Sequence, residues 1–140
     1  MKKILLLVMA FAFANTITAQ TKTNNNKHKI VFQLASDDTL VHKALMKQLN
    51  NIVTVAPETK IEVVVQGGGL TMLMINKTIV QEKIAQLKKK NVEFVACEFS
   101  MTDKKITKEM MIPEAGFVPY GILEIVTKQE EGWSYIKSGF

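Results

Sequence analysis

The chain has 140 residues, of which 47% are hydrophobic and 22% charged, a composition typical of one globular domain. All 18 basic residues are lysines, and from Ile30 onward 13 lysines balance 13 acidic residues, so the net charge of +5 comes from the N-terminal region. Because a neutral domain without arginine lacks the side chain that most often recognises phosphate and guanine, we expect no nucleic-acid partner.

The first 19 residues have the pattern of a secretory signal peptide. Two lysines precede the apolar run 4–14, and Ala19 supplies a small residue for cleavage, with Ala14 as an alternative. The run is too short to span a bilayer, so we expect a protein exported to the periplasm that is not an integral membrane protein. Residues 20–29 are rich in Asn, Thr and Lys and are expected to form a flexible tether.

The remainder, 30–140, is expected to form a single domain in which short apolar runs alternate with segments of helical periodicity. The apolar runs predict strands at 30–34, 60–65, 92–97 and 116–118. The spacing of Ile122, Ile125, Val126, Gln129, Trp133 and Ile136 predicts one final helix that carries them on the same side. In this helix, Trp133 and Tyr135 would anchor the C-terminus against the sheet.

Alternation of this kind predicts a mainly parallel sheet of four or five strands with helices on both faces, a three-layer α/β/α sandwich. Ligands of such sheets bind beyond the carboxyl ends of the strands, where the connecting loops meet. The candidate site residues in those loops are Cys97 together with Ser36, Asp37, Gly67, Gly68, Gly69, Glu98, Ser100 and Tyr120.

Cys97 is the only cysteine and cannot form an internal disulfide. It ends an expected strand, and a thiol that begins a turn or helix is stabilised as thiolate by backbone N–H groups. Lys104 and Lys105 are expected to strengthen this effect and Glu98 to oppose it. The alternative is a small buried hydrophobic residue at the end of a core strand.

Four segments together resemble the DsrE/DsrF-like family: IEVVVQGGGL (61–70), VEFVACEFSM (92–101), ITKE (106–109) and QEEGWSYI (129–136). The resemblance implies a three-layer α/β fold, assembly into a homo-oligomer and transport of sulfur as a cysteine persulfide. Cys97 would then be the sulfur acceptor, and its partner a thiol- or persulfide-bearing protein or a small sulfur donor. This chemistry is thiol exchange on sulfur and requires no metal or organic cofactor.

The chain departs from the family pattern at two places. Relay proteins often carry a basic residue and a glycine several places after the cysteine, where this chain reads Lys104-Lys105-Ile106. Related chains often read histidine-glycine-proline-glycine after the second strand, where this chain has 66–69, QGGG. The relay enzymes are also cytoplasmic, so the resemblance implies the fold and the cysteine but not the pathway.

Three other interpretations stay open. The glycine triplet could hold a phosphate, but it fits no nucleotide motif, and a turn of close backbone approach is favoured. Met72, Met74 and Met101 could join Cys97 in a Cu(I) site, although methionine more often fills core gaps. The domain could also be a non-catalytic oligomeric binding module with a structural cysteine.

Overall fold

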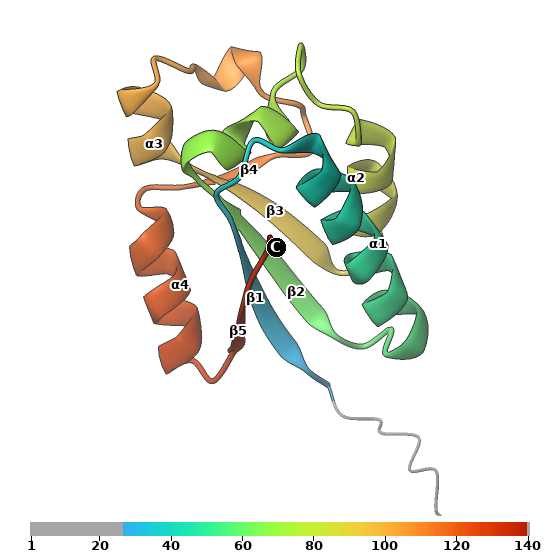
Figure 1. Cartoon of the computed structure of the whole chain (residues 1–140). Coiled ribbons are helices and arrows are strands. Elements are labelled where there is room, and N and C mark those ends of the chain that lie inside the picture. The colour runs from blue at the N-terminus through green and yellow to red at the C-terminus, as the bar shows by residue number, and fades with distance from the viewer. Residues whose placement is uncertain (1–26, 140) are drawn as a thin grey trace, which may run out of the picture.

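The computed structural model describes residues 27–139 (Figure 1). The expected signal peptide and residues 20–26 of the expected tether lie outside the described residues. Within the described part, Lys29 already belongs to the first strand, so the sheet begins one residue earlier than the sequence predicted.

Five strands form one parallel sheet in the order β4-β3-β2-β1-β5, which confirms the predicted fold class. The strands are β1 (Lys29–Leu34), β2 (Lys60–Val65), β3 (Val92–Cys97), β4 (Gly116–Val118) and β5 (Ser134–Lys137). Since all five run in one direction, their carboxyl ends share one edge of the sheet.

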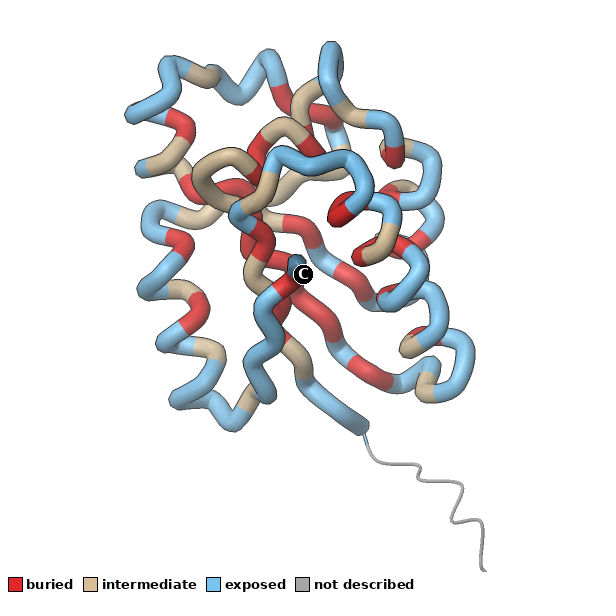
Figure 2. The backbone as a smooth tube through the Cα atoms, in the orientation of Figure 1, coloured by how far each residue is buried: buried red, intermediate tan, exposed pale blue. Residues whose placement is uncertain are grey.

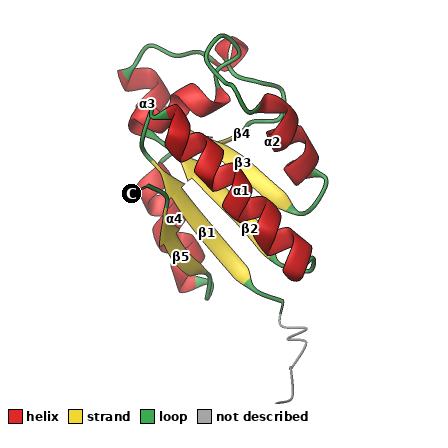
Figure 3. Ribbon diagram, turned by 45° about the vertical axis from the view of Figure 1, so that its right-hand side comes forward, coloured by secondary structure: helices red, strands yellow, loops and turns green. Residues whose placement is uncertain are grey.

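Helices cover the two faces of the sheet unequally (Figures 1 and 3). One face carries α1 (Thr39–Val55) and α2 (Gln81–Lys88), and the other carries α4 (Gly121–Glu130). Short helices lie beyond the carboxyl ends of the strands: η1 (Gly67–Leu73), α3 (Glu98–Asp103) and η2 (Lys108–Met110). No helix within residues 27–139 is long and apolar enough to cross a membrane.

Local sequence explains where α1 begins and which side it buries. The side chain of Asp38 accepts a hydrogen bond from the backbone N–H of Leu40 at 2.7 Å and so caps the helix. Val41, Leu45 and Leu49 repeat at the helical spacing and are buried against the sheet. The helix packs through this apolar stripe and leaves its polar side to solvent.

The buried residues, red in Figure 2, form two cores of different size, one on each face of the sheet. The larger core lies under α1 and α2 and includes the fully buried rings of Phe32 and Phe94. The smaller core joins Val31 and Val64 of the sheet to Ile125 of α4, with Val95 and Trp133 packed against it.

The predicted final helix is wrong beyond Glu130. Gly132 has a φ of +83°, a left-handed conformation that ends the helical path and turns the chain back to the sheet. Tyr135 and Ile136 then lie in the edge strand β5, which pairs with β1, and both are exposed. Trp133 packs against the smaller core with the Lys128 ammonium 4.8 Å from its ring centre, whereas Tyr135 does not anchor a helix.

Candidate functional site

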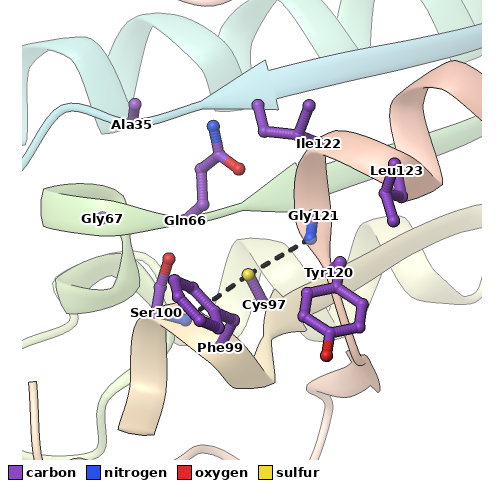
Figure 4. Close-up of a pocket in the computed structure, with 10 residues that line it drawn as sticks. All are labelled: Ala35, Gln66, Gly67, Cys97, Phe99, Ser100, Tyr120, Gly121, Ile122 and Leu123. Carbon is purple, nitrogen blue, oxygen red and sulfur yellow. Dashed lines mark hydrogen bonds between the residues drawn. The ribbon is translucent and has the colours of Figure 1, made fainter. Parts of the chain in front are cut away.

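A pocket of about 390 Å³ opens at the carboxyl edge of the sheet (Figure 4). Its lining comes from the residues that follow β1 and β2, from the junction of β3 and α3, and from the start of α4: Ala35, Gln66, Gly67, Cys97, Phe99, Ser100, Tyr120, Gly121, Ile122 and Leu123. None of these side chains carries a permanent charge. The pocket therefore offers the Cys97 sulfur a mostly apolar surrounding.

Cys97 stands at the junction of β3 and α3, where it is the N-cap of the short helix. Its Sγ atom accepts hydrogen bonds from the backbone N–H of Gly121 at 3.2 Å and from that of Ser100 at 3.5 Å. The residue is only 4% exposed, yet it belongs to neither core cluster and its side chain lines the pocket. Two helix starts, those of α3 and α4, thus direct N–H groups at one sulfur.

These contacts decide the acidity of the thiol. Burial raises the pKa of Cys97. Hydrogen bonds from the side chain and backbone of Ser100 and from the backbone N–H groups of Gly121 and Phe99 lower the pKa by more than burial raises it. The net result is a pKa below the ordinary value for cysteine, so a larger share of the sulfur is thiolate. Lys104, Lys105 and Glu98 are not among the causes, in contrast to the sequence-based expectation.

Gly121 allows α4 to approach the sulfur this closely. A Cβ atom at this position would lie 2.8 Å from Oε1 of Gln66 and 3.1 Å from Cβ of Cys97. The Gln66 amide is the end of a flexible side chain and can turn away, but the contact with Cβ of Cys97 and an equal one with Cγ1 of Val64 are tight, so another residue here requires these neighbours or the start of α4 to shift by a few tenths of an ångström.

The structure brings some of the predicted site residues together and separates others. Gly67, Ser100 and Tyr120 line the pocket with Cys97. Five predicted residues do not line it: Ser36, Asp37, Gly68, Gly69 and Glu98.

These five have other surroundings. Ser36 accepts a hydrogen bond from the backbone N–H of Asp38 at 3.1 Å, and Glu98 forms an ion pair with Lys108 at 2.6 Å. Asp37 and Gly68 face a neighbouring hollow instead. A Cβ on Gly69 would lie 2.5 Å from the carbonyl oxygen of Leu34, which is the close backbone approach that the sequence predicted for this turn.

Sequence reasoning missed several lining residues, among them Gln66, Phe99 and Leu123. Gln66 directly precedes the glycine triplet and Phe99 follows the cysteine by two residues. Both could have been predicted, because both closely follow the end of a strand. In Figure 4 the Gln66 amide lies between Ala35 and Ile122, above the sulfur. Ile122 and Leu123 gave no separate signal, because they read as ordinary positions of an apolar helix.

The soft-metal interpretation receives no support from the packing. Met72 and Met101 are buried in the larger core, whereas Cys97 lines the pocket. Within residues 27–139 no group of three His, Cys, Asp or Glu side chains is placed to hold a metal ion.

Comparison with known families identifies the fold. The model of the DsrE/DsrF-like family matches residues 8–138, nearly the whole chain. This chain belongs to the DsrE/DsrF-like family. The match begins within the segment predicted as a signal peptide, and it includes Cys97 and every residue that lines the pocket.

Solved structures give the same fold. A protein of unknown function from Methanobacterium thermoautotrophicum, MTH1491, is 24% identical with a TM-score of 0.74, and the match covers 79% of this chain and 98% of that one. A conserved protein of unknown function from Bacteroides thetaiotaomicron, BT1422, is 14% identical with a TM-score of 0.63, covering 78% of this chain and 93% of that one. A search of curated proteins gave no match.

Proposed function

We propose that this DsrE/DsrF-like protein carries sulfur as a persulfide on Cys97. The observation that carries the proposal is the placement of Sγ in the pocket, with N–H groups from two helix starts aimed at it. These donors favour an anionic Sγ, which is the form that attacks a donor persulfide and the form released when the sulfur is passed on. Membership in a family known for sulfur relay adds to this support.

The reaction is a transfer of neutral sulfur between two thiolates. The Cys97 thiolate attacks the outer sulfur of a donor persulfide R–S–SH, the donor S–S bond breaks, and its electron pair leaves with R–S⁻. The new bond joins Sγ to the transferred sulfur, which keeps its proton. An acceptor thiolate then attacks that outer sulfur and releases Cys97 as thiolate, so no external oxidant or reductant enters the cycle.

The proposal includes two expectations that rest on the sequence. The first is export through a signal peptide at 1–19, cleaved after Ala19, which mass spectrometry of the secreted chain would test. The second is a homo-oligomer of the mature chain, which light scattering would test. The partner is a thiol- or persulfide-bearing protein or a small sulfur donor.

The mature protein and its Cys97→Ala variant should be treated with a low-molecular-weight persulfide, and their intact masses measured by mass spectrometry. The expected result is the added mass of one sulfur atom on the wild type alone, removed by a thiol reductant. The pH at which native alkylation of Cys97 is half-maximal should lie below that of the unfolded chain, because the folded pKa is lowered.

The second candidate is a binding module with a structural cysteine, and the low exposure of Cys97 is the observation in its favour. It predicts that the wild type takes up no sulfur and that iodoacetamide reaches Cys97 only after unfolding. Either rapid native alkylation or reversible sulfur loading would exclude it.

A further inference from the structure

A second hollow, of about 450 Å³, adjoins the Cys97 pocket at the same edge of the sheet, and Gly67 lines both. Its charged side chains are Lys77, Lys104 and Lys105 together with the single carboxylate of Asp37. The two hollows therefore differ in chemistry: one holds the thiol without any permanent charge, and the other carries an excess of positive charge.

This excess is not neutralised by the surrounding residues. Among the described residues, Lys88, Lys108 and Lys128 form ion pairs with acidic side chains, whereas Lys77, Lys104 and Lys105 form none. The domain as a whole has as many lysines as acids, so the hollow is a local concentration of positive charge on a neutral protein. Its volume lies in the range of small-molecule sites.

The backbone at Lys105 is a second unusual feature of this hollow. Lys105 follows the end of α3 with a φ of +55°, a left-handed conformation in which glycine is strongly favoured. This chain has a lysine there in spite of the strained backbone. The strained position adds a cation to the hollow.

The helix α3 separates the backbone position of Cys97 from that of the first lysine. Cys97 is its N-cap and Lys104 its C-cap, seven residues apart along the chain. At 1.5 Å of rise per residue this separation is about 10 Å. An extended tripeptide spans about the same length.

We propose that the lysine-lined hollow binds the anionic end of a small thiol or persulfide whose sulfur enters the Cys97 pocket past Gly67. The inference rests on the proposed function of Cys97 and names its substrate class, a low-molecular-weight thiol that carries a carboxylate. The sulfur transfer is the one already described, with R–S⁻ leaving while its carboxylate stays among the lysines.

The test compares two donors that differ in charge, glutathione persulfide and its diethyl ester. The rate of sulfur loading at low salt should be about fivefold higher for the acid than for the ester, the size of effect that one or two exposed ion pairs give. The double variant Lys104→Gln/Lys105→Gln should lose this preference. The matched control Lys89→Gln/Lys90→Gln changes the same charge at the C-terminal end of α2 and should keep it.

A binding measurement with a ligand that cannot transfer sulfur tests this inference separately from the proposed function. S-methylglutathione cannot transfer sulfur, and calorimetry should detect its binding to wild type more strongly than to Lys104→Gln/Lys105→Gln. Equal loading by both donors, or equal binding to both proteins, would overturn the inference and leave sulfur transport by Cys97 standing. Binding of S-methylglutathione without any loading by either persulfide would support the hollow and overturn the transport.

Discussion

The two faces of the sheet divide the tasks of this protein. The face under α1 and α2 holds the larger core, which includes Phe32, Leu45 and Phe94, all buried. The face under α4 has a much smaller core, in which Ile125 of the helix meets Val31 and Val64. Because burial of apolar surface is the main stabilising contribution, the first face supplies most of the stability.

The second face supplies the contact on which the chemistry depends. The first N–H of α4, that of Gly121, donates to the Cys97 sulfur, and Lys128 near the other end of the helix pairs with Glu62 of β2 at 3.0 Å. A helix held by few apolar contacts and one ion pair can be changed without unfolding the domain. The comparison therefore predicts that variants on the first face lower stability and that variants on the second face alter Cys97.

Phe94→Ala should have the largest effect on stability. The ring is fully buried in the larger core, and its removal leaves a cavity, so the free energy of unfolding should fall by about 3–5 kcal/mol. Urea denaturation followed by circular dichroism measures this change. Val126→Ala, on the exposed side of α4, is the control and should change stability by less than about 0.5 kcal/mol. Equal losses for the two variants would refute the division between the faces.

Gly121→Ala should lower stability less but change the thiol more. The added methyl group would lie 3.1 Å from Cβ of Cys97 and from Cγ1 of Val64, so overpacking should reduce the free energy of unfolding by about 1 kcal/mol. A shift of this size at the start of α4 weakens the hydrogen bond from Gly121 to the sulfur, so the pKa of Cys97 should rise. The pH dependence of alkylation reports this shift, and Phe94→Ala, where it stays folded, should leave that profile in place.

The contrast between the faces also explains what the sequence could predict. Strands β2, β3 and β4 have the predicted bounds, because continuous apolar runs bounded by Gly, Pro and polar residues specify buried parallel strands. Cys97 at a strand end and the turn at Gly69 follow from the same local rules. The strands that contribute to the larger core could therefore be predicted from the pattern of apolar residues in the sequence.

The parts that could not be predicted depend on contacts between distant segments. Residues 134–137 continue a helical spacing in sequence, but pairing with β1 makes them a strand. The donor from Gly121 to Cys97 joins residues 24 positions apart, and no local pattern encodes it. Lys105 was likewise predicted to act on the cysteine, whereas in the structure it lines the neighbouring hollow.

Lys105→Gly and Lys105→Ala together separate the effect of backbone strain on stability from the effect of the lysine charge on binding. Glycine adopts the positive φ of this position without strain, so the free energy of unfolding should rise by about 1 kcal/mol. The same variant removes a cation from the second hollow and should weaken binding of S-methylglutathione. Lys105→Ala removes the charge but keeps the Cβ atom, so it should weaken binding without the gain in stability. A stability gain of equal size in both variants would contradict the strain argument.

Glu62→Gln should have the smallest effect at neutral pH and a distinct dependence on pH. Burial raises the pKa of Glu62 above 4.5, and the Lys128 ammonium offsets this rise only in part. A carboxyl with a raised pKa binds its proton more tightly in the folded state, so wild type loses stability as pH rises from 4.5 through the folded value. The glutamine variant does not titrate and lacks this loss, so its unfolding free energy relative to wild type should increase across that interval.

Lys128 keeps a second carboxylate partner, Glu124 at 3.4 Å, so the Glu62→Gln substitution leaves no unpaired charge and the net difference at pH 7 should stay within about 1 kcal/mol. Glu93→Gln, at an exposed position of β3, is the control for urea titrations at each pH, and an identical pH slope in both variants would show that Glu62 is not the group responsible.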